Sequence, residues 1–587
     1  MPPRKQASKK SLKTEPQIDQ NSSFTPQNFE DELKKLAKQA KGETWLKRAL
    51  EQVRVYGKAA SILAIIGVYA NVSLLSLSPV YGGIPAAVWH SKVIMAACFL
   101  GWSANLAFRR LLPTKTTLLL PLIAAYIPMV QFYLFKFSGS FTANWGPLIT
   151  ELLTLFPLMV LSVSCVADIL EEGDLSGLPK WVADCAPGLG SYSFYKFIEL
   201  LSADQLQAQI GRSFLQTRVG LELVLAGTYT IMAPSKLLLF VIPGLLHAAF
   251  FNTHVMTPMA TQALNSTLLS QGWSLVDRWE SVTGYISILD SHKDGFRVMR
   301  CDHSLLGGEW TKLPKYIVGE PIYSVFTMLE AVRLVEVAEK VPDNEAKALN
   351  IGLGIGTTPS ALIAHGIDTT IVEIDPVVYD FAVKYFGLPS NHTAVIEDAV
   401  GYTARIAEEE SQKFDYIIHD VFTGGAEPIP LFTLEFLQSL NTLLKPDGVI
   451  ALNYAGDFTL PPLSTVVRTV KEVFPSCRIF RENPAPSEEQ LKKEGRDFDN
   501  MVIFCRKTTD GIAFRRTVEQ DFLRSRSRQH FLAPKYEVDN KVFLTGDDVG
   551  IVRKNDTSKL GNWHDQTGLG HWAVMRTVLP KEVWENW

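Results

Sequence analysis

This sequence of 587 residues lacks the features that would assign it to several common classes of protein. Its net charge is only −4, so bulk electrostatics would not hold a nucleic acid, and we expect no nucleic-acid partner. Its six cysteines form no C-x-x-C pair, and its eleven histidines form no ligand-spaced cluster with them, so we expect no metal site. The scattered cysteines are typical of reduced, mostly buried thiols in a protein that faces the cytosol or a membrane.

The first 25 residues lack an apolar run. They are polar and rich in lysine, which predicts a disordered tail and excludes a secretory signal, because that signal needs an apolar core near its start. A helix is predicted from Thr25-Pro26, with Phe29 and Leu33 at helical spacing. This helix either lies on a membrane surface or is solvated, and residues 1–58 form the N-terminal region.

Long apolar runs, in contrast, are abundant between residues 59 and 255. Four of them reach the length of roughly 20 residues that a bilayer span needs. A fifth, Val219–Phe251, is either two short spans broken around Pro234 or one kinked helix. We therefore predict a multi-pass α-helical membrane domain of about six spans at 59–255, in contact with a lipid bilayer. The four long runs are Ala59–Val80, Val88–Phe108, Thr116–Phe135 and Pro147–Ile169.

Two acidic residues, Glu151 and Glu222, lie inside these runs. An acid within a membrane is a candidate functional residue. Both are close to the ends of their runs, which favours an interfacial position.

The distribution of lysine and arginine predicts the orientation of the membrane domain. Thirteen of these residues precede the first span and three lie in the loop Arg109–Lys115, whereas the loop 81–87 has none. The positive-inside rule therefore places the N-terminus in the cytosol. With six spans the rest of the chain also faces the cytosol, where nucleoside cofactors are found, and with five it lies outside. We expect an integral, multi-pass protein with a cytosolic C-terminal half, in a membrane that the sequence does not identify.

Residues 273–318 have a different pattern, in which apolar and polar side chains alternate. The alternation around the turn His292–Gly295 predicts a hairpin within a small β-subdomain. The pattern of 321–338 then predicts a helix.

A glycine-rich turn organises the next part of the chain. The sequence predicts a short strand, then Gly352, Gly354 and Gly356, a helix, and a second strand that ends in Glu373. Glycines allow the backbone to turn tightly and approach a ligand, and the helix N-terminus offers free N–H groups. Glu373 lies 21 residues after Gly352, where a Rossmann-type site places an acid that accepts hydrogen bonds from a ribose. The pattern favours nucleoside binding, and a turn in any doubly wound sheet is the alternative.

Further strands complete a Rossmann-like α/β domain at 319–506. A helix begins at Asp375-Pro376, the strand Thr393–Ile396 leads to Asp398-Ala399, and the strand Phe414–Asp420 ends in an acid. In such sheets the ligand lies beyond the carboxyl ends of the parallel strands, so we expect these acids and the glycines to meet at one crevice. Gly448–Tyr454 and Asn500–Cys505 are the remaining predicted strands.

These segments resemble the spermidine-synthase-like family, which joins polyamine aminopropyltransferases to class I S-adenosylmethionine-dependent methyltransferases. The resemblance covers roughly 275–506: the small β-subdomain, the helix with Tyr323, and the GLGIG, EID, EDA and DYIIHD segments in order. The segment LTGDD at 544–548 is similar to a late motif of the family. Residues 1–270 have no counterpart in the soluble synthases, so the chain resembles a membrane-fused member.

The resemblance implies a cofactor, S-adenosylmethionine or its decarboxylated form, and roles for individual residues. Glu373 would hold the ribose hydroxyls, and Asp398-Ala399 would contact the adenine. Asp420 would receive the proton of the attacking group, and Tyr323 would lie over the pocket of a small-molecule acceptor. The resemblance implies that this acceptor could be an amine and that the protein could form a homodimer. The other cofactor-binding candidates are Gly352, Gly354, Gly356 and Asp375.

Three departures from the aminopropyl synthases oppose an amine substrate. Ile355 stands where those enzymes carry an acid in the glycine turn, Ser324 replaces the glutamine after the pocket tyrosine, and Thr423 replaces a second acid near Asp420. A diamine is a dication, and a buried ammonium without carboxylates is costly. The sequence therefore slightly favours a membrane-anchored methyltransferase. An aminopropyltransferase and a non-catalytic membrane protein with a degenerate nucleotide fold are the alternatives.

The C-terminal extension, 507–587, contains an arginine cluster at 515–528 and is then rich in tryptophan. The arginines either contact anionic lipid or lie on a solvated helix face. The glycine-rich segment 561–572 is a candidate lid over the crevice.

Overall fold

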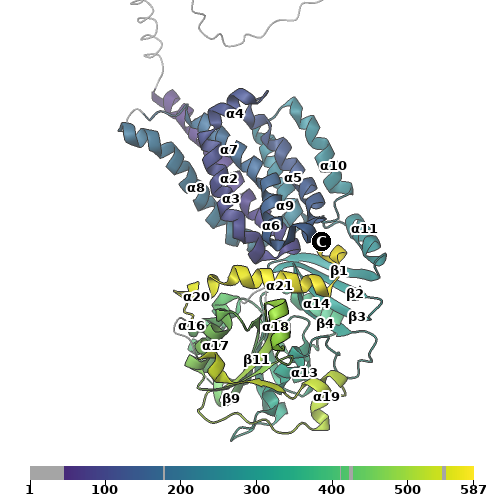
Figure 1. Cartoon of the computed structure of the whole chain (residues 1–587). Helices are drawn as coiled ribbons and strands as arrows, with labels where there is room; N and C mark the ends of the chain where they lie inside the picture. The colour runs from purple at the N-terminus through teal and green to yellow at the C-terminus, as the bar shows by residue number, and fades with distance from the viewer. Residues whose placement is uncertain (1–44, 176–178, 410–411, 422–427, 545–549) are drawn as a thin grey trace, which may run out of the picture.

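The computed structural model describes residues 45–175, 179–409, 412–421, 428–544 and 550–587. It consists of a helical bundle stacked on an α/β body (Figure 1). The predicted tail and amphipathic helix before residue 45 lie outside the described residues, as do Thr423 and most of the LTGDD segment.

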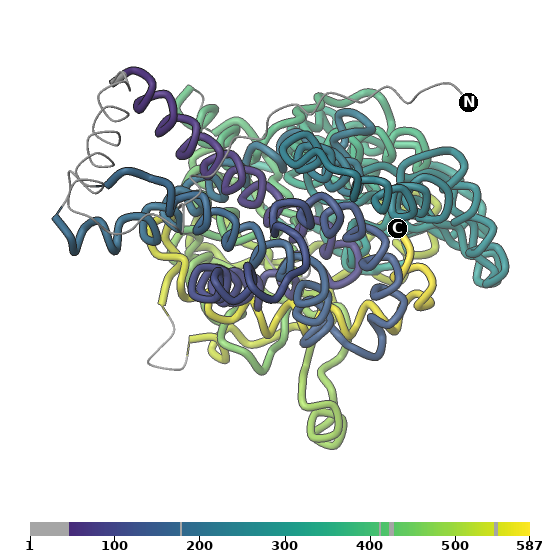
Figure 2. Tube along the Cα trace, turned by 90° about the horizontal axis from the view of Figure 1, so that it is seen from above, coloured from purple at the N-terminus to yellow at the C-terminus, as the bar shows by residue number. Residues whose placement is uncertain are grey.

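The bundle is built from long apolar helices that lie side by side (Figure 2). Three stretches, Leu46–Tyr81, Gly83–Ser103 and Ser138–Leu170, have the length and composition to cross a membrane, and Leu120–Phe135 and Lys236–Phe250 are shorter apolar helices. The elements of the bundle are α2 (Trp45–Tyr81), α3 (Gly83–Ser103), α4 (Asn105–Leu111), η1 (Thr116–Leu118), α5 (Leu120–Phe135), α6 (Ser138–Leu153), α7 (Leu155–Leu170), α8 (Lys180–Gln209), η2 (Phe214–Gln216), α9 (Arg218–Met232), η3 (Lys236–Val241) and α10 (Ile242–Phe250).

Helix α8 was not expected as a member of the bundle, because its sequence is polar in part. It packs along α2, where the side-chain amide of Asn71 donates to the carbonyl oxygen of Glu199 at 2.7 Å and to Oγ of Ser202 at 2.8 Å. Its other face exposes large apolar side chains, among them Trp181 and Phe197. Helix α8 therefore adds a pass along the bundle that the sequence did not predict.

The two ends of α2 lie at opposite ends of the bundle. Near its C-terminal end, the carbonyl oxygens of Pro79 and Val80 accept hydrogen bonds from Arg300 at 2.6 Å and Trp572 at 3.1 Å, both in the α/β body. A helix of 37 residues is about 55 Å long, so the start of α2 lies far from that body (Figure 1). The buried ion pair between Arg218 and Glu280, at 3.2 Å, also connects the bundle to the α/β body.

The two acids within the apolar runs are buried inside the bundle, and their predicted interfacial position in a membrane stays a prediction. Glu151 and Glu222 are both fully buried, and Oε1 of Glu151 lies 2.5 Å from Nδ1 of His90.

A small antiparallel sheet follows the bundle and confirms the predicted hairpin. Helix α11 (Pro258–Leu269) leads into it, and its strand order is β1-β2-β3-β4. Its strands are β1 (Trp273–Ser281), β2 (Gly284–Ser291), β3 (Phe296–Cys301) and β4 (Ser304–Trp310).

The predicted helix at 321–338 is only partly formed. It consists of α12 (Val325–Leu329) and η4 (Glu330–Leu334). It ends there because the backbone turns to pair with the C-terminal segment: the N–H of Arg515 donates to Leu334, and the N–H of Glu336 donates to Ala513, each at 2.8 Å.

The large sheet has the strand order β12-β10-β11-β9-β8-β5-β6-β7. Strands β5, β6, β7 and β8 pair in parallel, and β8 also pairs in parallel with β9. Strand β11 pairs antiparallel with β9 and with β10, and β10 pairs antiparallel with β12. The strands are β5 (Lys347–Ile351), β6 (Asp368–Glu373), β7 (Thr393–Ile396), β8 (Phe414–His419), β9 (Leu444–Asp457), β10 (Ser476–Arg481), β11 (Phe498–Arg506) and β12 (Tyr536–Val538).

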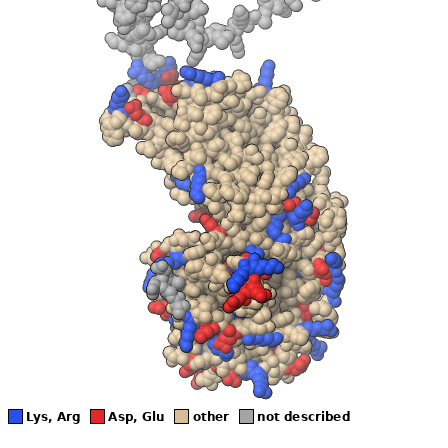
Figure 3. Space-filling view, in the orientation of Figure 1, with Lys and Arg blue, Asp and Glu red and all other residues tan. Residues whose placement is uncertain are grey.

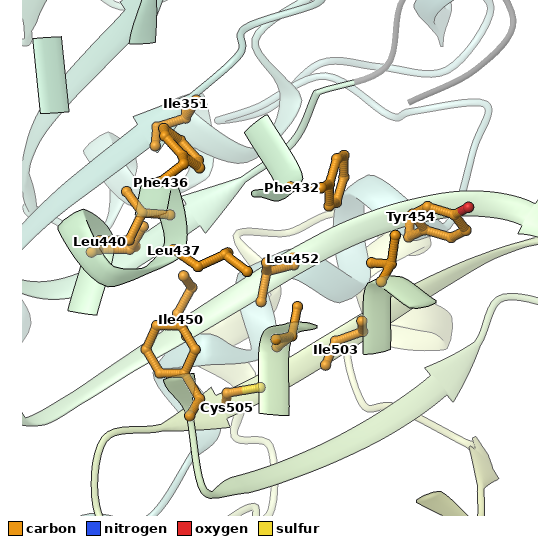
Figure 4. Close-up of a cluster of buried hydrophobic side chains, with 14 of the residues drawn as sticks. Ile351, Phe432, Phe436, Leu437, Leu440, Ile450, Leu452, Tyr454, Ile503 and Cys505 are labelled. Atoms are coloured by element: carbon orange, nitrogen blue, oxygen red, sulfur yellow. The ribbon is translucent and has the colours of Figure 1, made fainter. Parts of the chain in front are cut away.

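Helices cover the sheet and bury its apolar residues. Leu437 and Leu440 of α16 pack on Ile450 and Leu452 of β9 and on Ile503 of β11 (Figure 4). The helices of this body are α13 (Thr357–Ala364), α14 (Pro376–Phe386), α15 (Ala399–Glu409), η6 (Ile429–Phe432), α16 (Leu434–Leu443), α17 (Pro461–Val473), α18 (Glu488–Glu494), α19 (Arg526–Phe531), α20 (Ser558–Gly561), α21 (His564–Val578) and α22 (Lys581–Glu585).

The expectation that all cysteines are reduced thiols was wrong. Cys477 and Cys505 are paired across β10 and β11 and form a disulfide. The C-terminal arginines are divided: Arg516, Arg524 and Arg526 are exposed, whereas Arg515 and Arg528 make internal ion pairs. Arg528 is buried 2.7 Å from Glu330, and Arg515 lies 2.6 Å from Asp521.

Candidate functional site

A cavity of about 890 Å³ lies at the carboxyl ends of the parallel strands. Its walls come from β5, β6 and β8, from the small sheet, from the segment around Tyr323 and from α21. The predicted residues Gly352, Gly354, Glu373, Asp398, Ala399, Asp420 and Tyr323 all line it. The structure therefore brings together the strand ends that the sequence placed at one crevice.

The glycine turn needs glycine for two separate reasons. Gly352 has a φ of 81° and Gly354 a φ of 54°, in the left-handed region that favours glycine. A Cβ atom at Gly352 would collide with the carbonyl oxygen of Asp420, and one at Gly354 would collide with that of Leu306 in the small sheet. Gly356, with a φ of 83°, precedes α13 and does not line this cavity.

Glu373 faces the glycine turn, as the sequence predicted. Its Oε2 atom accepts a hydrogen bond from the backbone N–H of Leu353, and its Oε1 atom accepts one from that of Asp375, each at 2.9 Å. Burial raises the pKa of Glu373 to about 7. A carboxylate so fixed beside the turn has the position to accept hydrogen bonds from a ribose.

Asp398 and Ala399 follow the end of β7 and line the cavity. The carboxylate of Asp398 accepts weak hydrogen bonds from the N–H groups of Val400 at 3.3 Å and Gly401 at 3.2 Å, at the start of α15. Its side chain is exposed, so its remaining lone pairs face the open part of the site.

The prediction that Asp375 binds the cofactor is wrong. Its side chain is completely buried and does not line the cavity. One oxygen caps α14 by accepting from Val377 at 2.8 Å, and the other accepts from Oγ1 and N–H of Thr283 at 2.5 and 3.1 Å. Asp375 therefore ties the small sheet to the α/β domain, because capping and inter-sheet bonds use both of its oxygens.

Asp420 lies at the end of β8, beside Asn453 of β9. Oδ1 of Asp420 accepts a hydrogen bond from the side-chain amide of Asn453 at 2.8 Å. Burial raises the pKa of Asp420 to about 6. Such a carboxylate is ionised at neutral pH and still exchanges a proton readily, as a general base requires.

Tyr323 and Ser324 form the opposite wall. The ring of Tyr323 meets Phe326 edge-on with centroids 6.2 Å apart, and burial raises the pKa of its hydroxyl to about 12. Oγ of Ser324 donates to Oε1 of Glu482 at 2.6 Å, and the side-chain amide of Asn500 donates to Oε2 of Glu482, also at 2.6 Å. A carboxylate that the sequence did not single out is thus anchored beside Tyr323 and Ser324 in the wall of the cavity.

The C-terminal helix α21 closes part of the cavity, as the candidate lid suggested. His571, Met575 and two valines of α21 line it, and Nε2 of His571 lies 3.2 Å from Oγ of Ser304. Burial lowers the pKa of His571 to about 4, so its ring is neutral. Gln207 of α8 also lines the cavity, which brings the bundle to its edge.

The charge of the cavity has one sign. No lysine or arginine is present among its lining residues in the described part of the chain. Such a lining favours a cationic ligand and opposes a phosphorylated one. The acids that line it are Glu373, Glu397, Asp398, Asp420, Glu482 and Asp499.

The residue that departs from the aminopropyl synthases in the glycine turn does not face the cavity. Ile355 is buried and packs beside Gly307 of the small sheet. Among the described residues, no group of histidine, cysteine and acidic side chains has the arrangement of a metal site.

Three residues of the site were missed by sequence reasoning. Asn453 interrupts the apolar run of β9, and a polar residue in such a strand is a usable signal. Glu482 follows a strand that was not predicted, and His571 was included only within the candidate lid at 561–572 and was not singled out as a site residue.

Comparisons with known proteins agree with this geometry. Residues 329–482 match the family model described as the spermine/spermidine synthase domain. The chain is 46% identical over 548 residues to the N-terminal histidine N-methyltransferase of Emericella nidulans, a match that covers 90% of this chain and 97% of that protein. A polyamine aminopropyltransferase of Vibrio vulnificus is 40% identical over 111 residues, 18% of this chain and 37% of that protein. A probable spermidine synthase from Corynebacterium glutamicum superposes with a TM-score of 0.37 at 16% identity, over 47% of this chain and 96% of its own.

Proposed function

This chain belongs to the family of the Emericella nidulans N-terminal histidine N-methyltransferase, and we propose that it transfers a methyl group from S-adenosylmethionine to the imidazole of an N-terminal histidine in a polypeptide. It is an S-adenosylmethionine-dependent transferase with a spermidine-synthase-like domain. The observation that carries the proposal is the identity of 46% over 548 residues, which covers 90% of this chain and 97% of the relative.

The residues at the cofactor end fit S-adenosylmethionine. Gly352 and Gly354 form a tight backbone turn that lines the cavity, Glu373 offers a fixed carboxylate for the ribose, and Asp398 offers an acceptor for the adenine amine. The acidic lining suits a sulfonium cation. Bound S-adenosylmethionine supplies the electrophilic methyl group.

Asp420 suits an imidazole acceptor. The nucleophile is the lone pair of one ring nitrogen, and methylation leaves the ring cationic until the other nitrogen loses its proton. Oδ2 of Asp420 has no protein partner among the described residues and can accept that N–H, which orients the ring and removes the proton. A pKa of about 6 keeps this carboxylate ionised at neutral pH.

The name of the relative gives no support to the small-molecule amine acceptor or to the homodimer that the resemblance implied. An aminopropyltransferase is not favoured, because the relative that matches over 97% of its own length is an N-terminal histidine N-methyltransferase, whereas the aminopropyltransferase of Vibrio vulnificus matches over 37% of its length. The family assignment also opposes the alternative of a non-catalytic membrane protein with a degenerate nucleotide fold, because the relative is an enzyme.

The bundle anchors the enzyme in a membrane, in our proposal. Its long helices have spanning length, and their outer faces carry exposed residues such as Phe99, Ile231 and Phe251. Charged side chains gather at the far end of the bundle and over the α/β body, while the bundle surface between them is nearly free of charge in this view (Figure 3). Uncharged surface of this kind is what a bilayer covers.

The orientation that we propose differs from the one expected with six spans. The lysine-rich N-terminal region precedes the far end of α2, which favours a cytosolic position for that end. The α/β body lies at the other end, so it faces the opposite side of the membrane. The disulfide between Cys477 and Cys505 supports this orientation, because disulfides persist in oxidising compartments.

The test uses the purified full-length chain, S-adenosylmethionine with a labelled methyl group, and a peptide that begins with histidine. The control peptide has the same composition with histidine at the second position. We expect labelling of the first peptide only. Spermidine formation from putrescine and decarboxylated S-adenosylmethionine, without peptide labelling, would contradict the proposal.

A further inference from the structure

Glu482 lies on the same face of the sheet as the residues beside Asp420. In the antiparallel pairing of β9 with β11, Asn453 is opposite Val502 and Ala455 is opposite Asn500, so their side chains share a face. The N–H of Glu482 donates to the carbonyl oxygen of Asn500 at 2.8 Å, which places Glu482 one strand further along. With about 4.8 Å between strands and about 3.3 Å per residue, Asn453 and Glu482 are separated by about 12 Å of backbone. One amino-acid residue can fill the space between their side chains.

The carboxylate of Glu482 is held in place by hydrogen bonds to both of its oxygens. Its Oε1 atom accepts from Oγ of Ser324 at 2.6 Å and from the N–H of Val325 at 2.9 Å, and its Oε2 atom accepts from Asn500 at 2.6 Å. All of these partners are neutral donors, so its negative charge is oriented but not neutralised.

The other acids of the cavity already have partners or lie at the cofactor end. Glu397 forms an ion pair with Arg405, and Asp499 forms one with Arg481 at 3.2 Å. Glu373 and Asp398 accept from backbone N–H groups near the glycine turn and the start of α15. Glu482 is therefore the acid beyond Asp420 that is available to a cationic group of the acceptor.

An independent observation points to a ligand between these two acids. Asn453 is only 6% exposed and lines the cavity, and its Oδ1 atom has no hydrogen-bond partner among the described residues. A buried acceptor without a partner is costly, so the site lacks a donor that a ligand would bring. An ammonium group carries three such donors.

We propose that Glu482 binds the α-ammonium group of the acceptor's first residue and thereby restricts the enzyme to free polypeptide N-termini. The inference rests on the proposed function, which supplies an acceptor with that group. An internal or acetylated histidine offers a neutral amide instead, which leaves the half-buried carboxylate of Glu482 without a counter-charge. A charge-assisted hydrogen bond is then lost, which corresponds to about 10- to 100-fold in affinity.

The experiment compares two histidine-first peptides, one with a free and one with an acetylated N-terminus, on the full-length enzyme. The variants are Glu482→Gln and, as a matched control, Glu494→Gln, an exposed acid on the projecting helix α18 (Figure 2). We expect wild type to prefer the free peptide by about 10- to 100-fold in kcat/KM. Glu482→Gln should raise KM for the free peptide by a similar factor, change kcat by less than about threefold, and leave the acetylated peptide unaffected. Glu494→Gln should behave as wild type.

The pH dependence separates binding from a merely structural role. An α-amino group has a pKa of about 7.7 to 8.0, so KM of wild type for the free peptide should rise above pH 8 as the ammonium loses its charge. Glu482→Gln should lack this rise, and Glu482→Asp should recover part of the preference for the free peptide. Calorimetry with S-adenosylmethionine confirms that each variant is folded.

If wild type used both peptides equally, the role of Glu482 would be overturned but the proposed function would stand. The same holds if the Glu482→Gln variant binds S-adenosylmethionine and still prefers the peptide with the free N-terminus. Failure of wild type to methylate either peptide, with S-adenosylmethionine still bound, would instead overturn the proposed function and this inference together.

Discussion

The side-chain amide of Asn453 donates a hydrogen bond of 2.8 Å to Oδ1 of Asp420, where the parallel pairing of β8 with β9 ends. This bond fixes the carboxylate and leaves its second oxygen directed to other partners. The relationship joins a residue that sequence reasoning identified to one that it missed.

Replacing Asp420 with asparagine should remove the proton acceptor while preserving the shape of the site. We expect kcat to fall about 100-fold or more, with the affinity for S-adenosylmethionine changed by less than about threefold. Because the pKa of Asp420 is raised to about 6, activity of wild type should fall as pH decreases through 6, where this carboxyl becomes protonated. Steady-state rates between pH 5 and pH 8 check this, and a variant with an unchanged rate would exclude Asp420 as the base.

Glu373 should control cofactor affinity in a pH-dependent manner. Its pKa is raised to about 7, and a ribose requires the ionised form, so affinity should increase from pH 6 to about pH 8 and then level off. Binding at pH 6.5 should release a proton, which calorimetry in buffers of different ionisation enthalpy detects. Glu373→Ala should weaken binding by about 1.5–3 kcal/mol. Unchanged affinity would remove Glu373 from the cofactor site.

Asp375 should matter for stability and not for the cofactor. Asp375→Ala removes the cap of α14 and the bonds to Thr283, so we expect a loss of about 1–3 kcal/mol in the free energy of unfolding. Cofactor affinity of the folded variant should change by less than about threefold. Asp380→Ala, on the exposed face of the same helix, is the matched control and should lie within about 0.5 kcal/mol of wild type. A selective loss of cofactor binding would restore the original prediction for Asp375.

Alanine substitutions at two glycines distinguish the effect of backbone strain from the effect of a steric collision. Gly352 and Gly366 both have a positive φ, 81° and 89°, but an added Cβ collides with Asp420 only at Gly352. Gly366→Ala should cost about 1–2 kcal/mol of stability and keep cofactor binding. Gly352→Ala should lose cofactor binding, as measured by calorimetry, because the collision displaces the strand end that carries Asp420. Equal effects of the two changes would contradict a role for close backbone approach.

The proposed orientation can be tested in sealed membrane vesicles whose outer face is cytosolic. Protease added outside should leave the α/β body intact until detergent opens the vesicles. In the denatured protein, a thiol reagent should label Cys477 and Cys505 only after reduction. Cleavage of the α/β body in sealed vesicles, with both cysteines labelled after denaturation without a reductant, would support the cytosolic orientation that six spans implied.

Local signals predicted much of the α/β domain. The strands that end in Glu373 and near Asp420 were placed correctly, because a buried parallel strand followed by glycine or an acid is visible in the sequence. Asp375 was misassigned because a helix cap and a ligand contact use the same residue type beside a strand end. Helix α8 was missed because its stability comes from packing on α2, which its polar sequence does not reveal. Glu482 and His571 reach the cavity only through tertiary contacts.

The position of the transferred methyl group is the most direct test. A histidine-first peptide is incubated with the full-length enzyme and S-adenosylmethionine, and fragment-ion mass spectrometry locates the added mass. We expect one methyl group on the imidazole ring of residue 1, and none in the reaction with Asp420→Asn on the same time scale. A methyl group on the α-amino nitrogen, on an internal histidine, or on no part of the peptide would contradict the proposed chemistry.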